Sequence, residues 1–158
     1  MKKSNFLIKL KRQDKLAIIE PSEDICNSYI KKAEDSLKSA RVLLQNNLYE
    51  NSVSMSYYTM YNSLTALLFK VGIKCENHSG SIILFKNLFG RLDLYRTITF
   101  AKKERVDKQY YVDFILTKES AIDLLKKAED FLVKMKLIIK NIRNEDTQKL
   151  KEKLKYIL

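Results

Sequence analysis

Apolar residues recur every three or four positions over most of this chain, a spacing typical of helices with one buried face. The intervals between them are polar and carry most of the charge. Helices are therefore expected throughout the middle of the chain. Five stretches show the spacing: 22–46, 50–71, 78–90, 92–108 and 117–142. In the first stretch the expected apolar face consists of Ile25, Tyr29, Ala33, Leu37, Ala40 and Leu44, and a connecting turn is expected at 110–114.

The expected helix boundaries coincide with residues that favour helix ends. Ser22 and Thr117 stand where an N-cap side chain accepts a backbone N–H, and Gly72 and Gly90 stand where helices commonly stop. The chain has only three Gly and one Pro, whereas a sheet needs frequent turn signals. We predict an all-α fold, a single-domain and mostly antiparallel bundle of four to five helices.

The two ends of the chain are expected to lie outside this bundle. Residues 1–20 form a basic lead-in, in which Leu16 to Ile19 make a short strand or pack as an arm. The bundle then occupies 21–144, and 145–158 form a short C-terminal helix or a frayed tail. No stretch approaches the roughly 20 apolar residues of a membrane span, and the N-terminus lacks a signal-peptide pattern. We therefore expect a cytoplasmic protein with no membrane partner.

The helix expected at 50–71 carries a stripe of small residues beside its apolar face. Small side chains at helical spacing let a neighbouring helix approach closely. The pattern leaves open whether that neighbour belongs to the same chain or to a second copy. The stripe consists of Ser52, Ser56, Thr59, Ser63 and Ala66.

The net charge of the chain limits the kinds of partner that it is expected to attract. Of 158 residues, 46% are hydrophobic and 31% charged, and the net charge is +11. Such an excess attracts polyanions or an acidic partner, although solubility alone also accounts for it. Cys26 and Cys75 are isolated, and the chain has one histidine, so the soft ligands of a zinc site are too few. We expect reduced thiols, no metal and no cofactor.

His78, the only histidine, follows a short polar loop and opens a helix. The free N–H groups of a helix start favour anions, so His78, Lys74 and Ser79 are candidates for binding a nucleotide or a phosphate. The simpler interpretation is that His78 caps the helix or closes the loop. Three tyrosines of the preceding helix either stack on nucleic-acid bases or belong to the core. They are Tyr57, Tyr58 and Tyr61.

The order of these features resembles HEPN domains, in particular the small stand-alone HEPN proteins of prokaryotes and archaea. The resemblance rests on a tyrosine-rich helix, a glycine stop and a His-Ser-Gly helix start. Those residues are Ser56-Tyr57-Tyr58-Thr59-Met60-Tyr61, Ala66-Leu67-Leu68, Gly72-Ile73 and His78-Ser79-Gly80. Three further segments also fit: Ile19-Glu20-Pro21, Arg105-Val106-Asp107 and the helix at 120–135.

The resemblance implies a helical bundle that pairs into a homodimer across two long helices. It also implies a minimal nucleotidyltransferase as partner, in a two-gene module often of toxin–antitoxin type. Many HEPN domains are metal-independent ribonucleases, in which an arginine is followed four to six residues later by a histidine. The histidine takes the 2′-hydroxyl proton, and the arginine stabilises charge on the attacked phosphate.

The chain departs from that catalytic motif. None of its six arginines has a histidine at the required distance, and Arg105 is followed there by Tyr110 and Tyr111. A phenol with a pKa of about 10 is a poor base at neutral pH. We therefore predict an interaction module that binds nucleotide or RNA without cutting it. The predicted binding residues are Lys74, His78, Ser79, Arg105 and Tyr110.

Two other hypotheses remain open. In the first, the chain is a divergent metal-independent ribonuclease in which His78 and Arg105 meet in space as the catalytic pair. In the second, which rests on family analogy alone, the partner enzyme modifies Tyr110 or Tyr111. For Arg105, a local contact with Asp107 that orders a turn is the simpler interpretation.

Overall fold

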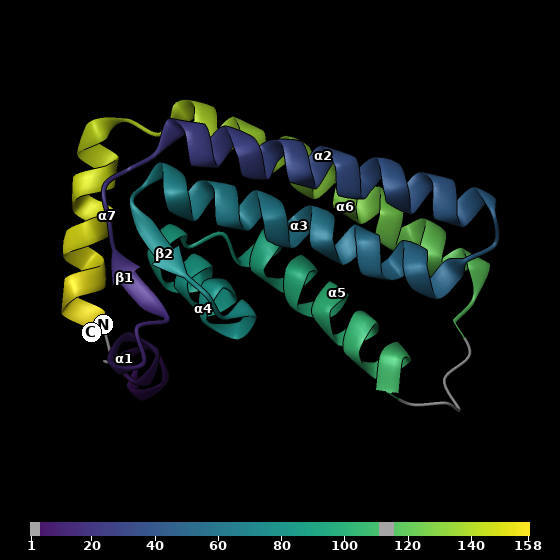
Figure 1. Ribbon diagram of the computed structural model, residues 1–158, viewed down its shortest axis with the longest axis horizontal. Coiled ribbons are helices and arrows are strands. Elements are labelled where there is room, and N and C mark those ends of the chain that lie inside the picture. The colour runs from purple at the N-terminus through teal and green to yellow at the C-terminus, as the bar shows by residue number, and fades with distance from the viewer. Residues whose placement is uncertain (1–3, 111–115) are drawn as a thin grey trace.

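The computed structural model describes residues 4–110 and 116–158, and the side chains of these residues apart from 106–110. The described part holds seven helices and two short strands (Figure 1). In chain order they are α1 Asn5–Arg12, β1 Leu16–Ile18, α2 Glu23–Gln45, α3 Tyr49–Lys70, β2 Ile73–Cys75, α4 His78–Phe89, α5 Leu92–Tyr110, α6 Lys118–Asn141 and α7 Asn144–Ile157.

The all-α prediction is confirmed, and the five helices expected from the apolar spacing are α2 to α6. The bundle therefore has the expected number of helices, and the ends of the chain add α1 and α7 to the part that the structure describes. The turn predicted at 110–114 lies outside the described residues apart from the last position of α5.

Helix α3 lies at the centre of the bundle and packs against α2, α4, α5 and α6. Figure 1 shows α2 and α3 as a long antiparallel pair, with α6 running beside them and α5 crossing below. Tyr57, Met60 and Leu64 of α3 are fully buried, together with Phe85 of α4 and Phe131 of α6. A helix surrounded in this way buries side chains all round rather than along one stripe.

The small-residue stripe of α3 finds its neighbour within the same chain. Its five members are all fully buried. The Ser52 hydroxyl donates to the Ala40 carbonyl of α2 at 2.8 Å, so the two helices approach closely at that point. At Ser52 the stripe therefore serves the α2–α3 contact.

The predicted helix ends are confirmed. The Ser22 hydroxyl accepts from the Ile25 N–H, and the Thr117 hydroxyl accepts from the Ser120 N–H. Gly72 has φ +73°, and a Cβ there would lie 2.4 Å from the Ile19 carbonyl oxygen, so only glycine fits this turn. One core expectation was wrong: the apolar spacing placed Ile25 on the buried face of α2, yet its side chain is 39% exposed.

The two ends of the chain pack on the bundle and on each other. Strand β1 pairs with β2 in an antiparallel sheet, and the Ser4 N–H before α1 donates to the Ile157 carbonyl of α7 at 3.3 Å. Leu7 of α1 and Leu154 of α7 are buried. The strand alternative for Leu16 to Ile19 and the helix alternative for 145–158 are thus the ones observed. Within the described residues, none of the helices combines the length and the apolar character needed to cross a bilayer.

Candidate functional site

His78 is the first residue of α4. Strand β2, which precedes it, leads the chain back along the bundle, so that His78 lies beside the middle of α3. Its Nδ1 lies 2.7 Å from the Tyr57 hydroxyl oxygen. The Tyr61 ring stacks on the imidazole at 3.7 Å between centroids, and Tyr58 meets it edge-on at 6.3 Å. Tyr57 is fully buried and the imidazole half-buried, so α3 fixes both the position and the orientation of the ring.

Two cations of α5 complete this site. Residues 102 and 105 lie one turn apart on the same face of α5. The Lys102 amine donates to the Ser79 hydroxyl beside His78. The Arg105 guanidinium lies over the Tyr58 and Tyr57 rings, 4.9 and 5.4 Å from their centroids. We call the following side chains the His78 cluster: Tyr57, Tyr58, Tyr61, His78, Ser79, Lys102 and Arg105.

The electrostatics of the cluster keep the imidazole neutral. Burial lowers the pKa of His78 below its ordinary value of 6.5, and Arg105 and Lys102 lower it further. Burial, followed by the charge of Arg105, also lowers the pKa of Lys102. Burial raises the pKa of Tyr57, so its phenol keeps its proton at neutral pH.

We infer the position of the imidazole proton from the Tyr57 hydroxyl. Within the described part of the chain, His78 Nδ1 is its only hydrogen-bond partner. A buried hydroxyl that accepted from Nδ1 would leave its own proton unbonded, whereas one that donates to Nδ1 is satisfied. Donation by Tyr57 requires the proton of the neutral ring to sit on Nε2. His78 then offers an N–H donor at Nε2 rather than the lone pair of a base.

The cluster can therefore bind an anion. Lys102 and Arg105 contribute positive charge, and Ser79 and His78 contribute neutral hydrogen-bonding groups. The cluster lies at the N-terminus of α4, where backbone N–H groups favour negative charge. A phosphate group matches this set of donors.

The structure brings together three of the residues predicted to bind: His78, Ser79 and Arg105. The fourth, Lys74, lies in β2 and forms an ion pair with Glu76 at 2.6 Å on the surface. The Tyr110 side chain lies outside the described residues, as do the Asp107 side chain and Tyr111.

Sequence reasoning placed Lys102 on a basic helix face suited to phosphate contacts but did not include it among the predicted binding residues, and it missed the role of Tyr57. The spacing of Lys102 to Arg105 along α5 was available as a signal, since positions three apart share a helix face. The hydrogen bond from Tyr57 had no such signal, because the residue also belongs to the core, as its helical spacing predicted. The core interpretation is confirmed for Tyr57, which is fully buried. The Tyr57 and Tyr61 rings stack on His78, and stacking on a base stays a prediction.

The residues that the structure describes contain no group of three His, Cys, Asp or Glu side chains arranged to hold a metal. Cys26 and Cys75 are buried free thiols. Burial raises the pKa of both. Their placement favours packing over chemistry, because a protonated thiol is a weak nucleophile.

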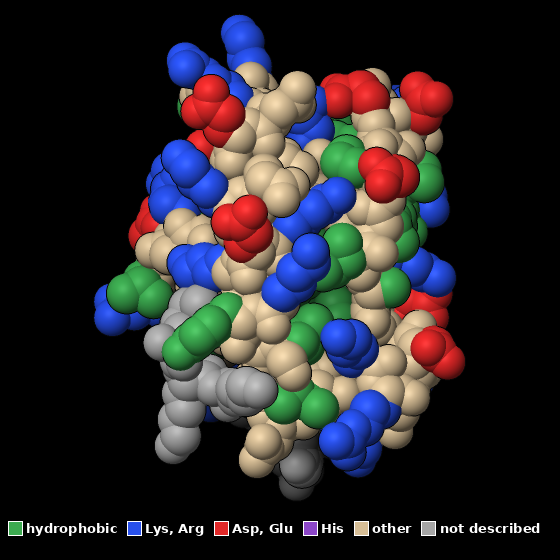
Figure 2. Space-filling view, turned by 90° about the vertical axis from the view of Figure 1, so that its left-hand side faces the viewer, with side chains coloured by type: hydrophobic (Ala, Val, Ile, Leu, Met, Phe, Trp, Pro, Cys, Tyr) green, Lys and Arg blue, Asp and Glu red, His purple; other side chains and the backbone are tan. Residues whose placement is uncertain are grey.

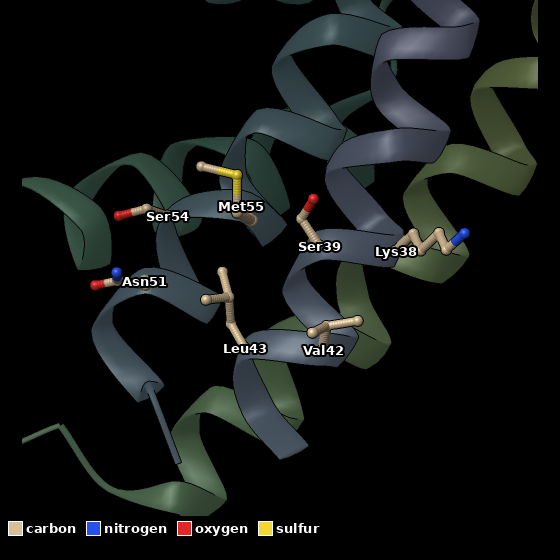
Figure 3. A pocket seen from close by; sticks show the side chains of 7 residues that line it. All are labelled: Lys38, Ser39, Val42, Leu43, Asn51, Ser54 and Met55. Atoms are coloured by element: carbon tan, nitrogen blue, oxygen red, sulfur yellow. The ribbon is translucent and has the colours of Figure 1, made fainter. Parts of the chain in front are cut away.

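A second candidate site is an open groove of about 640 Å³ between α2 and α3. The residues that line it precede His78 in the chain. Figure 3 shows side chains of both helices around it. Val42 is 50% exposed there, and Leu43 and Met55 add apolar surface. Its polar lining comes from Lys38, Ser39, Asn51 and Ser54. Such a groove suits contact with another helix more than it suits chemistry.

Comparison with known proteins identifies the family. The HEPN domain family matches residues 26–139, which is more than half of the chain. The chain belongs to the HEPN domain family. The resemblance deduced from the tyrosine-rich helix and the His-Ser-Gly helix start is thereby confirmed.

Relatives of this HEPN protein are small chains of similar extent. It is 34% identical to the "Putative toxin MJ0142" of Methanocaldococcus jannaschii over 129 residues, covering 75% of this chain and 88% of the relative. It is 32% identical to the "Putative toxin MJ0605" of the same organism over 118 residues, 72% of this chain and 87% of the relative. A UPF0332 protein of Thermotoga maritima is 26% identical over 128 residues, 77% of this chain and 96% of the relative.

Proposed function

We propose that this HEPN protein belongs to a toxin–antitoxin-type pair and binds a nucleotide or RNA phosphate through the His78 cluster without cutting it. The toxin names of two relatives support the first part. The hydrogen bond from Tyr57 to His78 Nδ1 carries the second, because it turns the single imidazole into a donor. Cleavage without a metal needs a base for the 2′-hydroxyl, and a protonated Nε2 cannot accept that proton.

The cations explain why the bound group is anionic. Lys102 and Arg105 face a neutral imidazole, so an arriving phosphate gains charge-assisted hydrogen bonds and relieves their mutual repulsion. Binding of this kind weakens as salt rises, because released counterions drive it.

Fluorescence anisotropy with a labelled single-stranded RNA and with nucleoside triphosphates tests the binding. Lys102→Ala and Arg105→Ala each weaken binding about tenfold, the loss that one charge-assisted contact gives. Lys103→Ala is the matched control, since Lys103 is the exposed neighbour of Lys102 on α5 and lies outside the cluster. Equal losses for Lys102→Ala and Lys103→Ala would show that the net charge, not the cluster, binds the anion.

The second candidate function is the divergent ribonuclease. One observation favours it: the charge of Arg105 acts on His78 across two helices, as a catalytic pair would require. Incubation of the pure protein with RNA and a chelator decides between the two. The binding function predicts intact RNA. Cleavage that disappears in His78→Ala would reject it in favour of the ribonuclease.

The partner and the oligomer belong to the same proposal. The family resemblance supports a homodimer and a minimal nucleotidyltransferase, and the groove of Figure 3 supplies exposed apolar surface on two long helices for the second copy. Light scattering after gel filtration measures the dimer, which Val42→Glu should dissociate. Co-purification tests the nucleotidyltransferase. Mass spectrometry of the co-expressed pair tests modification of Tyr110 or Tyr111.

A further inference from the structure

A second apolar groove lies where α6 turns into α7. It consists of two adjoining hollows of about 510 and 370 Å³ that share Ile142. One extends along the last turns of α6, and the other lies between α7 and the end of α4. We call the pair the α6–α7 groove.

The floor of this groove is apolar and open to solvent. Leu137, Ile138 and Ile142 form it on the α6 side, and Phe89 and Leu150 on the other. The Leu137 side chain is 54% exposed. A single exposed leucine is ordinary in a folded protein. Leu137 also borders a hollow of this size, so its exposed side chain and the apolar floor form one contiguous apolar surface.

Val133 lengthens that surface. It precedes Leu137 by one helical turn on the same face of α6 and is 58% exposed. These two residues are among the more exposed large apolar side chains of the described chain. The surface is therefore long enough to receive more than one side chain of a bound segment.

The rim of the groove is basic. Arg91, Lys134, Lys149 and Lys153 line it, against one carboxylate, that of Asp146. The Asp146 carboxylate accepts from the Arg143 N–H at the start of α7, so it is already used.

Two of these cations have exposed partners. Arg91 pairs with Asp93, and Lys134 with Asp130. The Arg91–Asp93 pair is bidentate, whereas the exposed Lys134–Asp130 pair contributes little and exchanges readily for another carboxylate. Figure 2 shows the face that carries α7, on which basic side chains are spread with hydrophobic ones between them.

We propose that the α6–α7 groove binds an acidic amphipathic segment of a partner protein, with apolar side chains on the floor and carboxylates at the rim. Four cations against one carboxylate favour an acidic occupant here, and the groove of Figure 3 already serves the proposed contact between two copies. RNA is disfavoured because bases stack on aromatic rings, and Phe89 is the one aromatic residue among the lining residues described.

Part of the groove lies outside the residues that match the family. Ile142, Lys149, Leu150 and Lys153 lie beyond the matched residues 26–139. None of the groove residues belongs to the His78 cluster, so this proposal stands or falls independently of the proposed function.

The experiment uses the whole protein and two labelled peptides. One is a synthetic amphipathic helix of leucine and glutamate, and the other has the same composition in scrambled order. The amphipathic peptide should bind, and the scrambled one should bind at least about tenfold more weakly, since only the first presents an apolar face. Leu137→Glu should weaken binding by a similar factor, and its exposure predicts an unchanged melting temperature.

A matched lysine pair tests the rim. Lys134 and Lys127 both lie on α6 in pairs with an aspartate four residues earlier, and their side chains are 42% and 44% exposed. Lys134→Glu should weaken peptide binding, whereas Lys127→Glu should not. Equal binding of the two peptides, or equal loss for the two lysine variants, overturns the proposal. So does polyuridylate RNA that binds more tightly than the peptide and is released by Leu137→Glu.

Discussion

Replacing Tyr57 by phenylalanine removes one oxygen atom and keeps the buried ring. The lost contact is the 2.7 Å hydrogen bond to His78 Nδ1. The stacking of the rings and the burial of residue 57 stay the same. The substitution therefore isolates the hydroxyl that we assign as the donor.

The expected cost follows from that geometry. A hydrogen bond contributes about 0.5–1.5 kcal/mol, and a partner left buried and unpaired costs more, so Tyr57→Phe should destabilise the protein by about 1–2 kcal/mol. For a chain of this length, that corresponds to a fall in melting temperature of about 2–8 °C. The donor stabilises the neutral imidazole, so its removal should also raise the pKa of His78.

Two-bond proton–nitrogen correlation spectra read the result directly. The chain has one histidine, so one imidazole pattern appears and needs no assignment among several. In the wild type, the neutral ring should carry its proton on Nε2. In Tyr57→Phe, a mixture of the two neutral tautomers should appear, and the titration should move to higher pH.

Tyr58→Phe is the control, since the Tyr58 ring also contacts His78 but only by its edge. It should leave both the tautomer and the titration unchanged. A wild-type proton found on Nδ1 would refute the reasoning. Tyr57 would then be the acceptor, Nε2 would carry a lone pair, and the imidazole would be competent as a base.

Three further predictions concern stability. The pKa of His78 in the folded protein is lowered from its ordinary value of 6.5, so the unfolded chain binds more protons than the folded one as the pH falls through and below 6.5. The free energy of unfolding should therefore drop in that pH range. In urea unfolding, His78→Gln should flatten that part of the pH profile. Gly72→Ala should lower the free energy of unfolding by about 3 kcal/mol or more, and Gly90→Ala by only about 1–2 kcal/mol. Both glycines have positive φ, but an added Cβ would meet the Ile19 carbonyl at Gly72 and open space at Gly90. Equal falls in melting temperature for the two variants would contradict the clash at Gly72. Arg41→Ala should lower the free energy of unfolding, measured with urea, by less than about 1 kcal/mol, because the 2.9 Å ion pair of Arg41 with Glu129 is half exposed. A larger loss would mean that this pair stabilises the packing of α2 against α6.

The helix boundaries could be predicted because they depend on local chemistry. Ser22, Thr117 and Gly72 act on backbone groups within four residues, and each was identified at its observed position. The ends of the chain were less certain because their order depends on tertiary contacts. Leu154 is buried against the rest of the fold, and no local signal distinguishes it from a leucine of a frayed tail.

The error at Ile25 has the same origin. Apolar spacing gives the direction of a helix face, but not how far the neighbouring helices extend along it. Ile25 lies in the first turn of α2 and is partly exposed, whereas Ala33 and Leu37, farther along that face, are buried. Periodicity alone therefore overestimates the core near helix ends.

The candidate site shows where a linear motif stops being informative. A search for a histidine four to six residues after an arginine asks whether one short segment of the chain carries both groups. Here α4 provides the imidazole and α5 the guanidinium, so proximity arises from the packing of both helices on α3. Under the function proposed above, proximity alone does not restore the chemistry, because Tyr57 on a third helix donates to His78 Nδ1. We therefore propose that the partner of the second imidazole nitrogen decides whether this chain binds or cleaves RNA, a property that the spacing of arginine and histidine cannot express.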